Sequence, residues 1–491
     1  MTNLIRPSRR PSMKHAARAL AIASLLFGAA SCDTTVTNPG PVTDAFISDR
    51  NASSALVLGA GRALSQGMNW ISYTGAAVTR EIHPAGSTGS FGITTAWQYG
   101  NLADGDPDLD THWEQMSRGR WLGEEAVRRL VAMGAPPAGS LQTPAQYALL
   151  LQQAYLYVGF ANKLMGENFC YSVIDGGPEG PSSDFLLRAE TAFTNAIAVD
   201  FTGITMTAAQ TTQRSSQIAA AYGGRAATRL DIGTAAALTN ADADAVAELA
   251  LASPGGASMV FNMPYYTTDD AIRNRVFWSS GNSRESGSAY RAHTQWNTWY
   301  LAYRYGSSTA APGTAVIADT RVSAQTSTQA QGDAAIDCCG KVSFFPEAKY
   351  IASTGNIKLV NGREMNLIRA EVELLKGVTA NSVTVLNFIN AARTNAGAPA
   401  VTTTDVSCAS NCPDLWRLLK RERGIELWLE ARRLGDFRRW KAKGANDFGT
   451  YDPLESIGAS AFPYNPSHLQ KQDLCFPVAM SEKRTNPNNI P

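Results

Sequence analysis

Three glutamates near the C-terminus stand at a spacing that could serve catalysis. Glu422, Glu426 and Glu430 are each four residues apart, so on one helix they would form a single row of carboxylates. Like charges at this spacing repel each other by about 0.2–0.5 kcal/mol per pair. Either the row takes part in acid–base chemistry, or it is held in ion pairs that fix the packing.

Cations nearby in the sequence favour the ion pairs. The same stretch contains Arg421, Arg423, Arg432, Arg433, Arg438 and Arg439. Arg369, in an earlier predicted helix, is a further candidate partner for the row. Arginine suits this role because its planar guanidinium can engage a carboxylate through two bonds. The row is therefore predicted to be structural, with Trp428 and Trp440 in the core, and Glu426→Ala is expected to lower thermal stability.

Two aromatic segments are the predicted ligand-binding surfaces. Aromatic rings can stack on the C–H faces of sugars, while nearby polar side chains bond to the hydroxyls. The candidate residues are Trp97, Tyr99 and Asn101 in the first segment and Trp296, Trp299 and Tyr300 in the second. The alternatives are that these rings fill a small core beneath the loops or contact a partner protein.

Alternating carboxylates form a candidate calcium site. Asp104, Asp106 and Asp108 supply hard oxygen ligands, which Ca²⁺ prefers. The EF-hand pattern is not met, because Leu109 stands where a glycine is needed and Gln115 where a glutamate is needed. The other interpretation is a solvated loop before the next helix. No other cofactor is expected.

The N-terminus predicts export and lipidation. Residues 1–31 have the form of a secretory signal. Five basic residues and no acidic residue come first, and an apolar run at 19–30 follows them. Small residues directly before Cys32 resemble a lipoprotein cleavage box, so Cys32 is the predicted lipidated N-terminus. Plain secretion with cleavage nearby is the alternative. Removal of this leader leaves an acidic excess, which argues against nucleic-acid binding.

Six cysteines remain after Cys32, and export favours disulfides among them. They are Cys170, Cys338, Cys339, Cys408, Cys412 and Cys475. Cys408 and Cys412 could close a small local ring, with a zinc site as the weaker alternative because no histidine is near. The pairing of the six cannot be read from the sequence.

Helical patterns predict a mainly α protein. Ala-rich amphipathic segments recur between residues 110 and 250 and between 361 and 440. Thr111 with Glu114 reads as a capping box, and Pro144 stands at a first helical position. Small residues at facing positions allow close helix pairs, as in helix–turn–helix repeats. Residues 253–345 lack any sustained period and are rich in Gly, Ser, Thr and Asn, which is typical of a functional loop region.

Several motifs in order resemble the SusD/RagB family of outer-membrane nutrient-binding lipoproteins. They are LLLQQAYLYVGFANKLMGE, DTRV, FPEAKY, GREMNLIRAEVELLKG, RERGIELWLEARRLGDFRRW and the ending LCFPVAMSEKRTNPNNIP. The resemblance implies a SusD-like body of TPR-like helix pairs in a right-handed superhelix, with loops as the ligand face. It also implies a lipid-anchored outer-membrane protein without catalysis, which captures a glycan or peptide and covers a SusC-like TonB-dependent transporter.

The resemblance suggests a division of the chain into five parts. These are a signal peptide at 1–31, a lipidated tether at 32–45, an N-terminal helical region at 46–252, a loop-rich aromatic insert at 253–345 and a C-terminal helical region at 346–491. Two other functions stay open. One is a helical hydrolase that uses Asp104 or Asp106 with Glu114, and the other is a helical-repeat scaffold lipoprotein that binds proteins.

Overall fold

The computed structural model describes residues 44–79, 81–84, 102, 108–233, 239–243, 258–268, 270–280, 293–295, 321, 347, 349–376, 382–402, 413–442 and 473–488. The chain divides into two compact units, residues 1–49 and residues 50–491. In the first unit, α2 (Asp44–Ile47) is a single short helix. The second unit holds the elements that follow.

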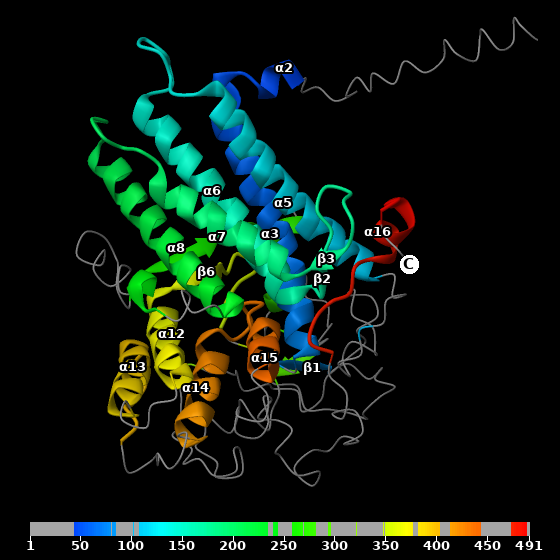
Figure 1. Cartoon of the computed structure of the whole chain (residues 1–491), viewed down its shortest axis with the longest axis vertical. Coiled ribbons are helices and arrows are strands. Elements are labelled where there is room, and N and C mark those ends of the chain that lie inside the picture. Colours follow the sequence, from blue (N-terminus) through cyan, green and yellow to red (C-terminus); the bar gives the residue numbers. More distant parts are fainter. Residues whose placement is uncertain are drawn as a thin grey trace, which may run out of the picture. The chain divides into compact units, whose positions relative to one another are not determined.

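Long antiparallel helices build the first part of this unit, shown from blue to green in Figure 1. They are α3 (Ser53–Val78), α5 (Asp108–Met133), α6 (Pro144–Asn168), α7 (Ser183–Ala198) and α8 (Ala208–Ile232). Each packs against the next. Glycines permit the close approach: a Cβ atom on Gly119 of α5 would lie 3.2 Å from the Leu64 backbone of α3. The predicted role of small residues at facing positions is confirmed there.

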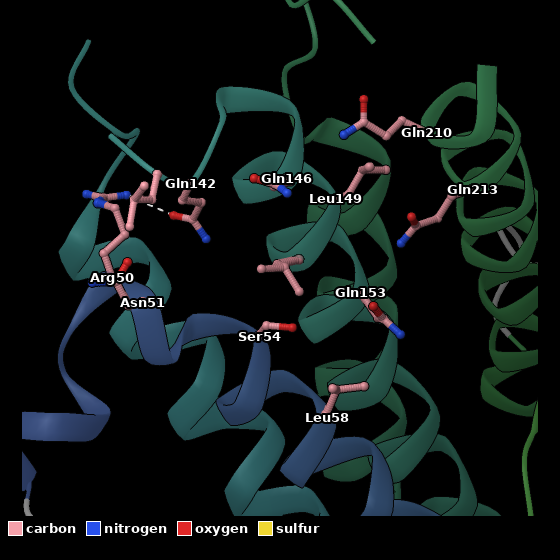
Figure 2. Close-up of a pocket in the computed structure, with 12 residues that line it drawn as sticks. Arg50, Asn51, Ser54, Leu58, Gln142, Gln146, Leu149, Gln153, Gln210 and Gln213 are labelled. Atoms are coloured by element: carbon pink, nitrogen blue, oxygen red, sulfur yellow. Dashed lines mark hydrogen bonds between the residues drawn. The ribbon is translucent and has the colours of Figure 1, made fainter. Parts of the chain in front are cut away.

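Two of these helices begin with the same side-chain cap. Thr143 accepts a bond from the Gln146 backbone and the Gln146 side chain accepts one in return, and Thr207 and Gln210 do the same for α8. Figure 2 shows both glutamines near one end of the bundle. Pro144 is the first residue of α6, as predicted. The predicted cap at Thr111 is wrong, because α5 already includes Asp108 and Thr111 lies inside it.

The C-terminal part packs a second group of helices against the first. It contains α12 (Gly362–Leu375), α13 (Ser382–Asn395), α14 (Pro413–Glu426), α15 (Arg433–Ala442) and α16 (Met480–Thr485). α12 contacts α8, and α15 contacts α6, so residues far apart in sequence meet here. Within the described residues the fold is mainly α, as predicted.

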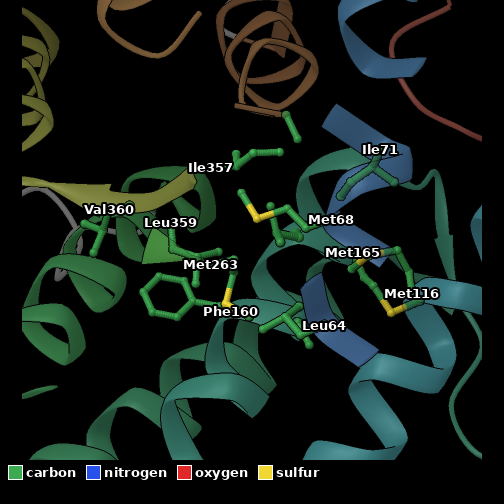
Figure 3. Close-up of a cluster of buried hydrophobic side chains, with 14 of the residues drawn as sticks. Leu64, Met68, Ile71, Met116, Phe160, Met165, Met263, Ile357, Leu359 and Val360 are labelled. Carbon is green, nitrogen blue, oxygen red and sulfur yellow. The ribbon is translucent and has the colours of Figure 1, made fainter. Parts of the chain in front are cut away.

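Short helices and strands complete the described fold. They comprise η1 (Arg50–Ala52), η5 (Asp270–Ile272) and α10 (Arg275–Ser280), with three antiparallel strand pairs: β1 (Ile82–Pro84) with β5 (His293–Gln295), β2 (Tyr171–Ser172) with β3 (Gly180–Pro181), and β4 (Val260–Met263) with β6 (Ile357–Asn361). The β4–β6 pair lies against the long helices. Figure 3 shows Ile357 and Leu359 near Met263 and Phe160 in the larger hydrophobic core.

A disulfide joins Cys170, just after α6, to Cys475 in the C-terminal segment. Backbone bonds flank it, since Cys170 donates to the Phe476 carbonyl at 2.8 Å and Phe476 donates to the Asn168 carbonyl at 2.7 Å. The prediction of disulfides is confirmed for this pair. The other four cysteines lie outside the described residues.

No described helix is both long enough and apolar enough to cross a membrane.

Candidate functional site

The glutamate row is buried, but it is not on one helix. Glu422, Glu426 and Glu430 are 0%, 4% and 1% exposed. α14 ends at Glu426 and α15 begins at Arg433, so Glu430 lies in the turn between them. The prediction of one continuous helix is wrong here, because Leu429 and Ala431 adopt left-handed backbone angles with φ of 61° each.

Buried polar side chains hold this turn, which spans residues 427–432. The Leu429 amide donates to the Glu81 carboxylate at 3.2 Å, and the Leu429 carbonyl accepts from the Tyr350 hydroxyl at 3.1 Å. Lys349 donates to the Trp428 carbonyl, and Asn168 donates to the Ala431 carbonyl. A left-handed non-glycine residue costs about 1–3 kcal/mol. These contacts offset that cost by satisfying backbone groups that the broken helix releases.

Most cations that pair with the row come from other parts of the chain. Glu422 pairs with Arg393 and with Arg321, Glu426 with Arg363 at 2.8 Å, and Glu430 with Lys349 at 2.7 Å. Lys358 lies within 3.5 Å of both Glu426 and Glu430.

The structure places the two kinds of arginine that the sequence predicted as partners of the glutamate row in different surroundings. Arg421, from the same helix, lies 3.6 Å from Glu422. Arg369, the other predicted partner, donates to the Asn366 side chain and to the Ala243 carbonyl.

The arginines of this stretch form a second network with other acids. Arg423 and Arg439 both bond to Asp436, and Arg439 also bonds to Glu371 through two nitrogens at 2.8 and 3.0 Å. Arg432 pairs with Glu364. Sequence reasoning did not select Asp436, Glu364 or Glu371. The seven-residue spacing of Glu364 and Glu371, which places them on one face of α12, was the available signal.

One acid in each network has a pKa below its usual range. Burial alone would raise the pKa of Asp436, yet the Arg423 and Arg439 guanidiniums hold it well below its usual range. The pKa of Glu426 is also lowered, because Lys358 and Arg363 outweigh the effect of burial. A catalytic acid or base needs a pKa near the working pH and access to a substrate. The row has the chemistry of internal ion pairs instead.

Two buried acids beside the turn have raised rather than lowered pKa values. Burial raises the pKa of Glu81 to about 7, against the opposing influence of Arg433. Burial also raises the pKa of Glu347 to about 7, although Tyr350 and Lys349 donate backbone bonds to it. Glu81 directly precedes β1, so the turn at 427–432 is linked to the start of the segment that contains Trp97.

We expect Glu81→Gln to stabilise the protein more at pH 8 than at pH 5. Between its ordinary pKa of 4.5 and about 7, the unfolded state releases the proton of Glu81 while the folded state retains it, so stability falls as pH rises. Glutamine cannot ionise and can still accept from Leu429, so the variant should gain about 1–3 kcal/mol across this window. Melting temperatures at both pH values measure the gain. Glu125→Gln on α5, whose acid has a lowered pKa, is the control and should show no such growth.

The β1–β5 pair brings together the two chain segments that carry the predicted aromatic residues. Ile82 pairs with Gln295, and Pro84 pairs with His293. Trp296 follows Gln295 directly in the sequence, and the Trp97 segment follows Pro84. Leu102, after that segment, donates its amide to Asp473 at 2.8 Å. The described residues that precede the two segments are therefore paired in one short ladder.

Most of the predicted functional residues lie outside the described part of the chain. These are Cys32, Trp97, Tyr99, Asn101, Asp104, Asp106, Trp296, Trp299 and Tyr300. Asp108 is the first residue of α5. Among the described residues, no group of three or more His, Cys, Asp or Glu side chains could hold a metal ion.

Cavities in the described structure lie elsewhere. The first, of about 540 Å³, lies at one end of the helical bundle, and we call it the glutamine-lined cavity after Gln142, Gln146, Gln153, Gln210 and Gln213 (Figure 2). A second, of about 350 Å³, is bordered by Val127, Tyr155 and Leu187. A third, of about 260 Å³, lies beside Asp231, Arg438 and Arg439. None of these three is lined by the glutamate row.

The described residues define a helical class of protein whose C-terminal helices are joined to one another and to the rest of the fold by buried ion pairs. Residues 363–488 match the model of the SusD family. No curated protein matches the sequence. The chain is SusD/RagB-like, as its motifs suggested.

Solved structures have the same fold. A SusD homolog from Bacteroides thetaiotaomicron aligns with a TM-score of 0.63 and 12% identity, covering 89% of this chain and 96% of its own. A SusD superfamily protein from Bacteroides vulgatus aligns with a TM-score of 0.57 and 13% identity, covering 90% and 98%. Surface glycan-binding protein A from Bacteroides uniformis aligns with a TM-score of 0.55 and 14% identity, covering 90% and 99%. The SusD-like fold therefore extends over most of the chain.

Proposed function

We propose that this protein is a nutrient-binding lipoprotein of the cell surface that captures a glycan or another oligomeric nutrient. The observation that carries the proposal is the SusD family match at residues 363–488, together with the SusD-like fold. The similarity to a surface glycan-binding protein favours a glycan as the ligand. The protein binds and does not catalyse. The buried, paired state of Glu422, Glu426 and Glu430 supports this.

The binding surface is formed by the two aromatic segments. Trp97, Tyr99 and Asn101 act together with Trp296, Trp299 and Tyr300. The rings stack on sugar faces, and the polar groups bond to hydroxyls. The β1–β5 pairing supports this arrangement, because it ties both segments to one place in the fold. Capture is a binding equilibrium, and the nutrient then passes to a partner.

The partner is a SusC-like TonB-dependent transporter, and the anchor is a lipid on Cys32 in the outer membrane. The five-part division of the chain belongs to the same proposal, with residues 32–45 as the tether and 253–345 as the aromatic insert. Deleting residues 1–32 should release a protein that still binds its nutrient, because the deletion removes only the signal peptide and the lipid-bearing Cys32.

We expect Trp97→Ala and Trp296→Ala each to weaken glycan binding by at least about tenfold, the effect of losing one stacked ring of about 1.4 kcal/mol. An oligosaccharide array selects the ligand, and titration calorimetry on protein lacking residues 1–32 measures its affinity. Trp121→Ala is the matched control, because Trp121 lies on α5 with 52% of its surface exposed.

The proposal fails if neither tryptophan affects binding while Trp121 does, or if the array finds no ligand. Release of shortened sugars from the ligand would indicate the hydrolase instead. Capture of proteins without any glycan would indicate the scaffold.

A further inference from the structure

The glutamine-lined cavity is a polar hollow walled by separate elements. Ser54 and Leu58 of α3 form one wall, Gln146 and Gln153 of α6 another, and Gln210 and Gln213 of α8 a third, as Figure 2 shows. Its volume of about 540 Å³ falls within the range of small-molecule sites, roughly 300–1,000 Å³.

Several of its amides are fixed by their oxygen atoms. The Gln146 and Gln210 oxygens accept the backbone amides of Thr143 and Thr207 at 2.8 and 2.9 Å, and the Gln142 oxygen accepts from Arg50 at 3.2 Å. The NH₂ groups of these three side chains have no acceptor among the described residues. Each therefore offers two donors whose position the fold has already set, which lowers the entropic cost of binding.

Acceptors are present beside these donors. Gln153 donates to the Tyr157 hydroxyl at 2.6 Å, which leaves its oxygen available. Ser54 adds a hydroxyl, and Gln213 adds a second complete amide. A ligand whose groups both donate and accept can match this mixture, and a sugar hydroxyl does both.

The cavity carries little net charge. None of the described residues that line it is a carboxylate. Its cation, Arg50, is already engaged, because it donates to the Met133 and Gly134 carbonyls at the end of α5 at 2.6 and 2.9 Å. Leu58 and Leu141, 62% and 88% exposed, provide apolar contact at the rim. These features favour a neutral ligand with C–H faces and many hydroxyls.

We propose that the glutamine-lined cavity is a binding site for a neutral oligosaccharide, separate from the aromatic segments. The inference stands on the cavity itself and does not depend on the proposed function. In a protein with both sites, two contacts to one long chain would raise the apparent affinity through effective concentration.

The experiment uses soluble protein lacking residues 1–32 in which Trp97, Trp296 and Trp299 are all replaced by alanine. Maltotriose, cellotriose and xylotriose are titrated by calorimetry, with trialanine and a galacturonic acid trimer as peptide and anionic comparators. In this background Q142A/Q213A removes two amides, and Ser54→Trp fills the cavity. Thr212→Ala is the control, because Thr212 is exposed on α8 next to Gln213 but does not line the cavity.

We expect at least one neutral trisaccharide to bind, with affinity reduced about tenfold or more by Q142A/Q213A and abolished by Ser54→Trp, while Thr212→Ala changes nothing. Melting curves confirm that each variant is folded. Absence of any trisaccharide binding, binding unaffected by both cavity variants, or stronger binding of the peptide or the acidic trimer would overturn the proposal. Binding that the tryptophan replacements leave unchanged but Ser54→Trp removes would support the cavity as a site separate from the aromatic segments.

Discussion

Replacing Asp436 by alanine is expected to lower the free energy of unfolding by about 3–5 kcal/mol, the cost of leaving buried charges without their partner. Asp436 is 4% exposed and accepts bonds from Arg423 at 2.7 and 3.0 Å and from Arg439 at 2.8 Å. Its removal leaves Arg423 with Glu371 at 3.6 Å as its remaining carboxylate, and Arg439 must share that same Glu371. Guanidinium chloride unfolding followed by circular dichroism measures the loss.

The loss of stability on removing an acid should be smaller where its ion-pair partners are more exposed to solvent. Glu426→Ala is expected to cost less, because Lys358 and Arg363 keep 22% and 20% of their side-chain surface exposed and can recover water. Glu125→Ala on α5 is the less buried control: one partner, Arg128, is 65% exposed and the other, Arg129, is 10% exposed, so the loss should be smaller than for Asp436→Ala. Equal losses for Asp436→Ala and Glu125→Ala would show that the C-terminal network contributes nothing special. Loss of ligand binding without loss of stability in Glu426→Ala would contradict the structural role of the row.

The contribution of Asp436 should depend on pH in one direction. Its pKa is depressed in the folded state, so the stabilisation is present above the unfolded value of about 3.9 and disappears as pH falls through the folded value. The difference in stability between the parent and Asp436→Asn should therefore be constant from pH 5 to pH 8 and shrink below about pH 4. A difference that stays constant down to pH 2 would mean that Asp436 does not act as an ion.

Local features were the most predictable from the sequence. Pro144 and the small facing residues of the helices follow from chemistry within a few positions, and the structure confirms them. The break after Glu426 could not be predicted this way. Leu429 and Ala431 belong to residue types that favour helices, and contacts from distant residues, among them Glu81, Tyr350 and Asn168, hold them in left-handed angles.

Contacts between distant parts of the chain could not be predicted from the sequence either. The burial of the glutamate row was expected from its own arginines, yet Arg393, Arg363 and Lys349 reach it from other elements. The strands β1 and β5 have three residues each and lie more than 200 positions apart, so no periodic pattern predicts their pairing. The glutamine-lined cavity likewise arises only when three helices meet, because Gln146 and Gln210 read in the sequence as helix caps.

Replacing both Cys170 and Cys475 by serine is expected to lower the free energy of unfolding by about 2–5 kcal/mol. The bridge joins residues 305 positions apart, so its removal releases a very large loop in the unfolded chain and increases the entropy of that state. The folded ends should remain docked, because Phe476 is fully buried and is held by backbone bonds to Asn168 and Cys170. The double variant should therefore fold to the same structure and unfold at lower denaturant concentration.

The double variant Cys408→Ser/Cys412→Ser is the control that tests whether the loss of stability depends on the length of the loop that a bridge closes. A bridge across three intervening residues would restrict the unfolded chain far less, so its loss should cost less than the loss of the Cys170–Cys475 bridge. The same difference should disappear when both proteins are unfolded under reducing conditions, where the Cys170–Cys475 bridge is absent. An equal cost for the two double variants in oxidising buffer would contradict the entropic account. In that case the Cys170–Cys475 bridge would act through contacts in the folded state, by fixing the C-terminal segment against the end of α6.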